Sequence, residues 1–315
     1  MEKVLVWGTG NIFRKYYDIL LNYVKNNEVE IIALINQTKS CEMINGYKVI
    51  CKEEVINYEY DKIIIMAEGI AKENIWNDIN QLMIDNKKIV SIAYLLRNYS
   101  GDDYHQNNIP CLEILELIRK TKKEKESIAV AEIGIDIGAT SIEVCKLLES
   151  TDTFYCFDFE DKIRELLLYL KGLDEVTCDL VGKGNSHKLY DSYCWSLCEL
   201  LFEMRNHKKL GIFDVVYLDG AHDFFRDGLA CCILKELIKP NGFIIFDDIC
   251  WNYGNSSTCN PKVFPQVKEL FTDEQIYDCQ IQRVVDAFML SDERFKQFYI
   301  ENISYLSRAI FIKES

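Results

Sequence analysis

The chain has 315 residues, enough for two domains, and 49% of them are hydrophobic, which is ample for buried cores. Acidic residues outnumber basic ones, so the formal net charge is −14 at pH 7 and the isoelectric point is about 4.9. Because binding to nucleic acid requires a large basic surface, this charge balance excludes nucleic acid as an expected main partner.

Cysteine usage and hydropathy indicate the compartment. The 13 cysteines are scattered, mostly in apolar segments, with no Cys-x-x-Cys pair, which is typical of reduced thiols inside a cytosolic protein. No signal peptide precedes Val4, and no apolar run reaches the ~18 residues that a membrane span requires. We therefore expect a soluble, cytoplasmic protein without a membrane partner, and the sequence leaves a homo-oligomer open.

Residues 1–97 predict a small Rossmann-like α/β domain. Apolar runs that indicate strands alternate with helical stretches, over residues 4–7, 30–36, 61–67 and 88–96. Gly8 and Gly10 follow the first run, where a tight turn would let a phosphate approach the N-terminus of the next helix.

The dinucleotide fingerprint of this first domain is broken. Phe13 stands in place of the third glycine of G-x-G-x-x-G, and Asn36-Gln37 end the second strand where an acid that holds a ribose is expected. The domain therefore either binds another ligand or is a degenerate module that packs, dimerises or positions an acceptor.

A joint is expected over residues 98–127. Its first part is polar and contains Gly101 and Pro110, so it predicts a loop. Its second part, from Cys111 onward, predicts a helix with a broad apolar face and a basic, solvated end.

A second, larger α/β domain is expected over residues 128–315. Seven strands are predicted, over residues 128–133, 153–160, 176–189 (a range that includes the loop after the strand), 213–218, 243–246, 283–290 and 307–313. Helices are predicted between them, including 139–148 and 263–271, and residues 240–242 (Pro-Asn-Gly) indicate a turn before the fifth strand.

Carboxylates follow two of these predicted strands. Asp219 ends the run 213–218, and Asp247 and Asp248 end the run 243–246. Since strand, helix and strand make a βαβ unit, both strand ends meet at the same edge of a parallel sheet. Three carboxylates gathered there predict a shared divalent cation such as Mg²⁺.

The first two strands of this domain also end in acids. Glu132 ends the run 128–133, and Gly134 and Gly138 bracket the turn into the next helix. Asp158 ends the second strand, where a carboxylate is placed to accept the hydroxyl protons of a ribose.

These motifs together carry a resemblance. E-x-G-x-x-x-G-A-T-S, the aspartate at the second strand tip, Y-L-D-G-A-H and K-P-N-G-F-I-I-F-D-D-I-C-W resemble class I S-adenosylmethionine-dependent methyltransferases over residues 128–315. Within that class they are most similar to metal-dependent O-methyltransferases of the catechol and macrocin types. Residues 1–97 resemble the nucleotide-binding-like domains that precede some bacterial sugar-modifying enzymes.

The resemblance implies a seven-stranded Rossmann-like methyltransferase fold and a set of site residues. It assigns Glu132, Gly134 and Gly138 to the methionine end of the cofactor, Asp158 to its ribose, Asn185 and Ser186 to its adenine, and Asp219, Asp247 and Asp248 to the metal. In catechol-type enzymes the last metal ligand is an amide, and a lysine follows the first aspartate by three residues. This chain has Asp248 and His222 at those places.

Metal-assisted methyl transfer would need a base. A bound Mg²⁺ would lower the pKa of a ligated sugar hydroxyl and orient it for in-line displacement. His222 follows Asp219 by three residues, and its imidazole suits a general base near neutral pH; His187 is a second candidate. The acceptor implied is a small molecule, a saccharide or another hydroxylated metabolite.

Two other functions are left open. One is an NAD(P)-dependent oxidoreductase, which the broken first fingerprint and the aspartate cluster disfavour. The other is a non-catalytic nucleotide-binding protein, which is disfavoured because Glu132, Asp158 and the three aspartates occur together.

Overall fold

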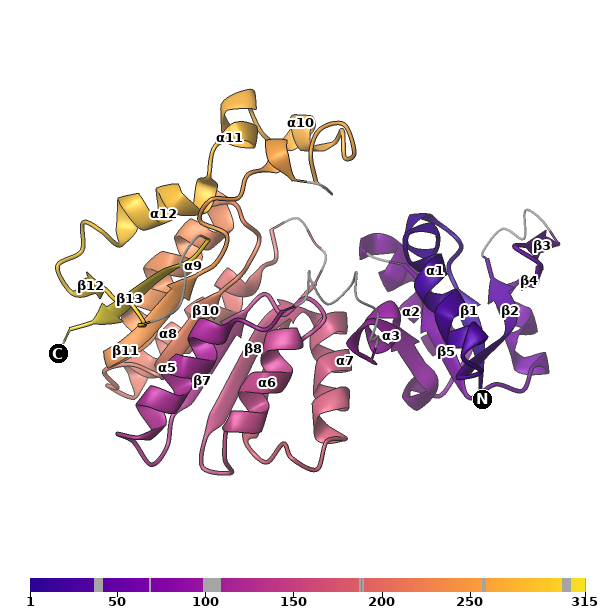
Figure 1. Ribbon diagram of the computed structural model, residues 1–315, viewed down its shortest axis with the longest axis horizontal. Helices are drawn as coiled ribbons and strands as arrows, with labels where there is room; N and C mark the ends of the chain where they lie inside the picture. The colour runs from indigo at the N-terminus through magenta and orange to yellow at the C-terminus, as the bar shows by residue number, and fades with distance from the viewer. Residues whose placement is uncertain are drawn as a thin grey trace. The chain divides into compact units, whose positions relative to one another are not determined.

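A computed structural model describes residues 1–36, 42–67, 69–98, 109–186, 188, 190–256, 259–301 and 307–314 (Figure 1). The chain divides into two compact units, residues 1–108 and 109–315. Each unit is built on its own, mostly parallel β-sheet with helices on both faces. The α/β fold class expected from the sequence, with a smaller Rossmann-like unit before a seven-stranded one, is confirmed.

The first unit holds a six-stranded sheet of order β3-β4-β2-β1-β5-β6. Its strands are β1 (Glu2–Trp7), β2 (Val29–Ile35), β3 (Met43–Ile44), β4 (Tyr47–Ile50), β5 (Lys62–Ile65) and β6 (Ile89–Ser91). Its helices are α1 (Asn11–Lys25), α2 (Gly69–Gln81) and α3 (Ile92–Asn98), with 3-10 turns η1 (Lys52–Asn57) and η2 (Asn86–Lys88). β1 lies in the middle and is buried on both faces, as its unbroken apolar run predicts.

One predicted strand of this unit is largely helical. The run 88–96 is extended only in β6 and then continues as α3. The Ser91 hydroxyl accepts the N–H of Ala93 at 3.1 Å and so supports the first turn of the helix.

The second unit holds a seven-stranded sheet of order β12-β13-β11-β10-β7-β8-β9, in which β13 runs antiparallel to its neighbours β11 and β12. The strands are β7 (Ala129–Ile133), β8 (Thr153–Phe159), β9 (Asp179–Asn185), β10 (Phe213–Leu218), β11 (Ile238–Phe246), β12 (Phe295–Gln297) and β13 (Ala309–Lys313). The helices are α5 (Leu112–Lys122), α6 (Ala139–Leu147), α7 (Glu160–Lys171), α8 (Tyr193–Asn206), α9 (Phe224–Leu237), α10 (Val267–Leu270), α11 (Asp273–Tyr277) and α12 (Gln280–Phe288), with the 3-10 turn η3 (Tyr253–Asn255).

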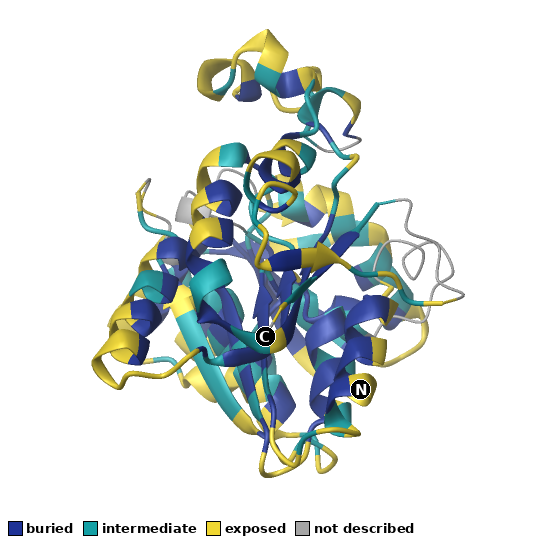
Figure 2. Cartoon of the chain, turned by 90° about the vertical axis from the view of Figure 1, so that its left-hand side faces the viewer, coloured by how far each residue is buried: buried dark blue, intermediate teal, exposed yellow. Residues whose placement is uncertain are grey.

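Both faces of this sheet are covered, which explains why β10 is apolar throughout. Val216 and Leu218 face α8, α9 and α12, whereas Val215 and Tyr217 face the layer of α5, α6 and α7. Figure 2 shows the buried strands between these helical layers. The helices therefore leave the ends of the strands as the part of the sheet that can hold polar groups.

Three predictions for the second unit are wrong in detail. Residues 283–290 form most of helix α12, because Ile281, Val284, Val285 and Phe288 recur at helical spacing and pack on α9; the remaining strand is β12. The helix expected over 263–271 is only the short α10. The expected turn at 240–242 lies inside β11, where the pairing with β10 shifts register.

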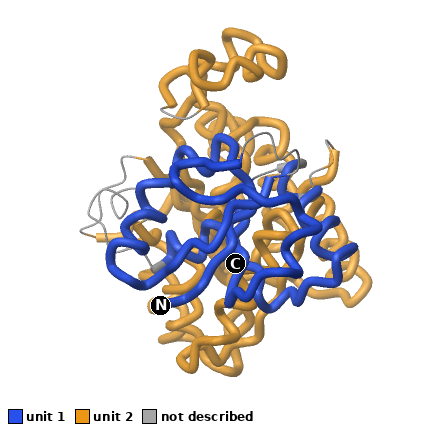
Figure 3. The backbone as a smooth tube through the Cα atoms, turned by 90° about the vertical axis from the view of Figure 1, so that its right-hand side faces the viewer, with its two compact units in different colours: residues 1–108 blue, residues 109–315 orange. Residues whose placement is uncertain are grey.

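The helix assigned to the joint packs within the second unit (Figure 3). Ile114, Leu117 and Ile118 of α5 are buried in the same core cluster as β7 and β8. Most of the predicted loop before it, residues 99–108, lies outside the described residues. Within the described ranges all cysteines are free thiols, and every helix is too short or too polar to cross a lipid bilayer.

A buried carboxylate ties α5 and the following loop to the sheet. Asp214 is 0% exposed and accepts the Lys125 and Lys239 ammonium groups, each at 2.7 Å, and the Ala129 N–H at 2.8 Å. These three bonds hold the start of β7 beside β10 and so help to fix how the two parallel strands are aligned.

Asp214→Ala should lower the free energy of unfolding by about 3 kcal/mol, because it leaves two ammonium groups and a backbone N–H without their acceptor. Denaturant unfolding would measure this, with the exposed Asp174→Ala as the control. Equal stability of the two variants would contradict the role given to Asp214.

Candidate functional site

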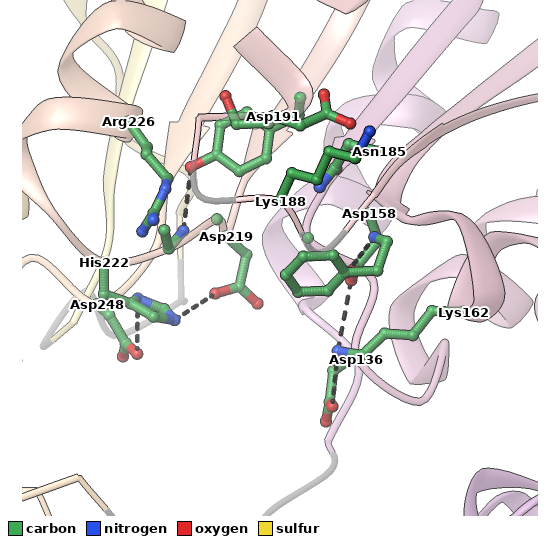
Figure 4. Close-up of a pocket in the computed structure, with 16 residues that line it drawn as sticks. Asp136, Asp158, Lys162, Asn185, Lys188, Asp191, Asp219, His222, Arg226 and Asp248 are labelled. Carbon is green, nitrogen blue, oxygen red and sulfur yellow. Dashed lines mark hydrogen bonds and ion pairs between the residues drawn. The ribbon is translucent and has the colours of Figure 1, made fainter. Parts of the chain in front are cut away.

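A cavity of about 590 Å³ opens at the carboxyl edge of the second sheet (Figure 4). Its walls come from the ends of five strands: Gly134 after β7, Asp158 in β8, Asn185 in β9, Asp219 after β10 and Asp248 after β11. Parallel pairing places these strand ends side by side, as expected for ligand sites in open α/β sheets.

Asp158 is held rigidly at one side of the cavity. Its carboxylate accepts the backbone N–H of Ile135 at 2.9 Å and of Phe159 at 2.7 Å, and Lys162 lies 3.6 Å away. The side chain is buried yet lines the cavity. Since a carboxylate has about four acceptor positions, it can still accept two hydroxyl groups.

Gly134 and Gly138 act differently. Gly134 has φ +82°, and a Cβ there would lie 1.8 Å from the carbonyl oxygen of Asp219, so only glycine lets the ends of β7 and β10 approach. Gly138, with φ +85°, precedes α6 and would clash with Leu166, and it does not line the cavity. Gly134 therefore shapes the cavity, and Gly138 shapes the packing of α6 on α7.

Glu132 lies beneath the cavity and does not line it. It is 2% exposed and accepts the Ser141 hydroxyl at 2.5 Å. Burial raises the pKa of Glu132 to about 8, the hydrogen bond from Ser141 opposes this rise in pKa, and the charge of Asp158 adds to it. At neutral pH Glu132 is therefore mainly protonated.

Asn185 and Ser186 differ in the same way as Gly134 and Gly138: one lines the cavity and the other does not. Asn185 is buried and lines the cavity. The backbone N–H and hydroxyl of Ser186 donate to Asp191, at 2.8 and 2.7 Å, and these two bonds lower the pKa of Asp191. Ser186 therefore shapes the loop, and Asp191 is the residue that reaches the cavity. His187, the second candidate base, lies outside the described residues.

Asp219, His222 and Asp248 form a candidate metal site, with one donor atom of each within 4.8 Å of the others. His222 stands between the two carboxylates: Nε2 is 3.7 Å from Asp219 and Nδ1 is 3.4 Å from Asp248 (Figure 4). Burial, followed by repulsion from Asp247 and Asp248, raises the pKa of Asp219 well above its ordinary value.

Asp247 is not part of this group. Its carboxylate accepts the phenol of Tyr217 and the guanidinium of Arg308, which lies 3.0 to 3.1 Å away. The sequence grouped three aspartates around a cation; the structure joins two of them to His222 and pairs Asp247 with Arg308. The physical reason is that consecutive residues diverge here, because Asp248 has a left-handed backbone with φ 52°.

Three residues of the cavity have a left-handed backbone, as do five other non-glycine residues elsewhere in the described ranges. Asp136, His222 and Asp248 have φ of 42°, 55° and 52°, a conformation that non-glycine residues adopt rarely, and all three line the cavity. Such conformations persist where the surrounding structure fixes them, most often at ligand sites.

Sequence reasoning missed the support beneath the loop that carries His222. Tyr193 donates to Asp227 at 2.5 Å and accepts the N–H of Ala221 at 3.1 Å. Burial raises the pKa of Asp227 to about 6. A Cβ on Gly220 would lie 2.3 Å from Asp227, so the loop needs glycine there. The available signal was Asp227 itself, an acid on the apolar face of a predicted helix.

An aromatic row starts beside His222, which lines the cavity. The ring of Trp251 lies 5.2 Å from His222 and 4.7 Å from Tyr253, which lies 4.7 Å from Phe271. This row belongs to the segment between β11 and α12, whose residues 257–258 are not among the described ones.

The chain is similar to a family and to several solved structures. Residues 1–90 match the family described as C2185-like, N-terminal. A putative O-methyltransferase from Klebsiella pneumoniae is 14% identical, with a TM-score of 0.44 over 70% of this chain and 95% of that one. A putative caffeoyl-CoA O-methyltransferase from Staphylococcus aureus is 16% identical, with a TM-score of 0.42 over 77% and 99%.

An O-methyltransferase from Bacillus cereus in complex with SAH is 11% identical, with a TM-score of 0.43 over 76% of this chain and 97% of that one. No protein of curated function matches the chain by sequence. At these identities the likeness concerns the fold, and the roles of the site residues have to be inferred from the chain itself.

Glu132→Gln should stabilise the protein in alkaline solution. Below pH 4.5 the carboxyl is neutral in both folded and unfolded states, so the variant should match the original. Between pH 4.5 and pH 8 only the unfolded state ionises, and the original loses stability progressively. Since one pKa unit corresponds to about 1.4 kcal/mol, the variant should be more stable by a few kcal/mol above pH 8.

Denaturant unfolding across this pH range measures the difference in stability between the variant and the original protein, with exposed Glu293→Gln as the control. A difference that does not change with pH would contradict the conclusion that Glu132 is a buried neutral acid.

Proposed function

We propose that the protein is an S-adenosylmethionine-dependent O-methyltransferase, assisted by a divalent metal, that acts on a hydroxyl of a sugar or another small metabolite. One observation carries this proposal: Asp158 and the Asp219–His222–Asp248 group line the same cavity. Figure 4 shows them on separate sides of that cavity, as a cofactor end and an acceptor end would require.

The cofactor end fits an adenosyl group. Asp158 is fixed by two backbone N–H groups and can accept both hydroxyl groups of a ribose. Gly134 leaves the backbone open, and Phe159 and Asn185 line the same wall. When bound, S-adenosylmethionine supplies a methyl group on a sulfonium for in-line displacement. The protein contributes orientation, because its rigid strand ends fix the ribose relative to the acceptor side.

The acceptor end fits a divalent cation. Asp219 and Asp248 offer carboxylate oxygens, which suit Mg²⁺ or Mn²⁺, and His222 offers a nitrogen between them. A cation held there would lower the pKa of an acceptor hydroxyl. We place His222 in this ligand set; the base role expected from the sequence would hold only with its imidazole outside the set.

The aromatic row supports a ring-shaped acceptor. Trp251 packs against His222, and Tyr253 donates its hydroxyl to the carbonyl oxygen of Ala221 at 3.5 Å. The C–H face of a saccharide ring can pack on such a surface while its hydroxyls turn toward Asp219 and Asp248.

The cofactor can be tested by calorimetric titration with S-adenosylhomocysteine. We expect micromolar binding that Asp158→Ala weakens more than tenfold, because the ribose loses its acceptor. Asp136→Ala is a matched control, since Asp136 lines the same cavity and approaches the same Lys162 but is 78% exposed. Absence of binding to the original protein would contradict the proposed function.

The metal can be tested separately by titrating Mn²⁺ and following its electron paramagnetic resonance signal. Asp248→Ala and His222→Ala should each weaken Mn²⁺ binding at least about tenfold, because each removes a ligand. Asp247→Asn should lower stability but leave the affinity within about threefold, since Asp247 is held by Arg308. If His222→Ala binds Mn²⁺ normally and only methyl transfer is lost, His222 is the base and not a ligand.

A further inference from the structure

The loop that joins β10 to α9 carries two of the proposed metal ligands, Asp219 at its start and His222 three residues later. The backbone of His222 is left-handed, with φ 55°, a conformation that non-glycine residues adopt rarely. Such a conformation persists where the surrounding structure fixes it. The hydrogen bonds on either side of His222 therefore help to fix where its imidazole lies.

Both residues that flank His222 are held through one buried carboxylate, that of Asp227. Asp227 lies in α9, is 0% exposed and does not line the cavity. One of its oxygens accepts the hydroxyl of Tyr193 at 2.5 Å, and the oxygen of that hydroxyl accepts the N–H of Ala221 at 3.1 Å. The other carboxylate oxygen accepts the N–H of Asp223 at 3.2 Å. The Asp227–Tyr193 pair thus holds the backbone immediately before and immediately after His222.

The same pair is packed directly against the loop. A Cβ on Gly220 would lie 2.3 Å from Asp227 and 2.5 Å from the hydroxyl of Tyr193. At the start of the loop, the N–H of Asp219 donates to the carbonyl oxygen of Ile133 at 2.8 Å. The sheet therefore fixes the beginning of the loop, and the Asp227–Tyr193 pair fixes the part that follows.

This arrangement places the imidazole of His222 between the carboxylates of Asp219 and Asp248, with Nε2 3.7 Å from the first and Nδ1 3.4 Å from the second (Figure 4). His222 contributes the nitrogen of the proposed ligand set, and the two carboxylates contribute oxygens. Oxygen ligands suit Mg²⁺ and Mn²⁺ alike, whereas an imidazole nitrogen suits transition-metal ions. The position of His222 therefore bears on which metal ion the site prefers.

We propose that the Asp227–Tyr193 pair positions His222 as a nitrogen ligand and so makes the site prefer a transition-metal ion such as Mn²⁺ over Mg²⁺. The proposal rests on the metal-assisted function proposed above. The pair acts through the loop and does not itself bind the metal, because Asp227 is buried outside the cavity and the hydroxyl of Tyr193 is engaged by Asp227 and Ala221.

The test is titration of the full chain with Mn²⁺, followed by electron paramagnetic resonance, with Mg²⁺ as the competing ion. In the original protein, Mn²⁺ should bind at least about tenfold more tightly than Mg²⁺, because one ligand is a nitrogen. The electron spin-echo modulation of the bound Mn²⁺ should show a coupled nitrogen.

Tyr193→Phe keeps the aromatic ring and removes the hydroxyl that holds Ala221. It should weaken Mn²⁺ binding about tenfold, leave the Mg²⁺ affinity within about threefold and reduce or abolish the nitrogen modulation. A merely structural loosening would weaken both ions alike and leave the nitrogen coupled.

Tyr23→Phe is the matched control. Tyr23 is 8% exposed, close to the 7% of Tyr193, and its hydroxyl donates to the carbonyl oxygen of Leu95 at 2.7 Å in the first unit. This variant also loses a buried tyrosine hydrogen bond, but it should leave the affinities for both ions and the nitrogen modulation unchanged.

Asp227→Asn provides the second variant should Tyr193→Phe fail to fold. Its amide offers one acceptor oxygen to two donors, so the same loss of Mn²⁺ preference and of nitrogen modulation is expected. The proposal is overturned if the bound Mn²⁺ of the original protein shows no coupled nitrogen, or if the variants keep that nitrogen. Absence of Mn²⁺ binding to the original protein would instead contradict metal assistance itself, and the proposal would fall with it.

Discussion

The larger unit is governed by one electrostatic constraint. Several of its parallel strands end in carboxylates at the same edge of the sheet, where burial limits the contact of these groups with water. Most of these carboxyl groups are protonated, hydrogen-bonded to backbone N–H groups or paired with a cationic side chain. Glu132 stays mainly protonated, Asp158 accepts two backbone N–H groups beside Lys162, and Asp247 is paired with Arg308. Asp219 and Asp248 each lie near a ring nitrogen of His222, and the charge of Arg308, which is paired with Asp247, also acts on Asp248. The repulsion of Asp219 by Asp247 and Asp248 is the physical reason for proposing a cation there.

Much of this edge follows from the sequence because it depends on topology. Apolar runs fix β10 and most of the other parallel strands, and parallel pairing then requires Asp158, Asp219 and the 247–248 pair to meet at one edge. The direction of each side chain does not follow. Asp247 and Asp248 are adjacent, and which one faces the cavity depends on a left-handed residue and on Arg308, which arrives from β13 much later in the chain. Such contacts leave no local pattern.

The remaining misreadings have the same origin. Helix α12 was mistaken for a strand because a short apolar run fits both periods until the helix that it packs against is known. In the first unit, the broken glycine fingerprint disfavours a dinucleotide, and this stays a prediction. Each unit thus has a cavity at the carboxyl ends of its strands: carboxylates line the one in the second unit, whereas none of the described residues that line the one in the first unit is charged.

The central claim is that one cavity holds an adenosyl cofactor at Asp158 and a divalent cation at Asp219, His222 and Asp248. A crystal structure of the protein with S-adenosylhomocysteine and Mn²⁺, with anomalous diffraction from the metal, would test it directly. The account predicts an anomalous peak within ligand distance of Asp219, His222 and Asp248 and a ribose on the Asp158 carboxylate. An anomalous peak at Asp247 would contradict it. So would a structure in which the cavity holds no cofactor and Mn²⁺ is bound elsewhere.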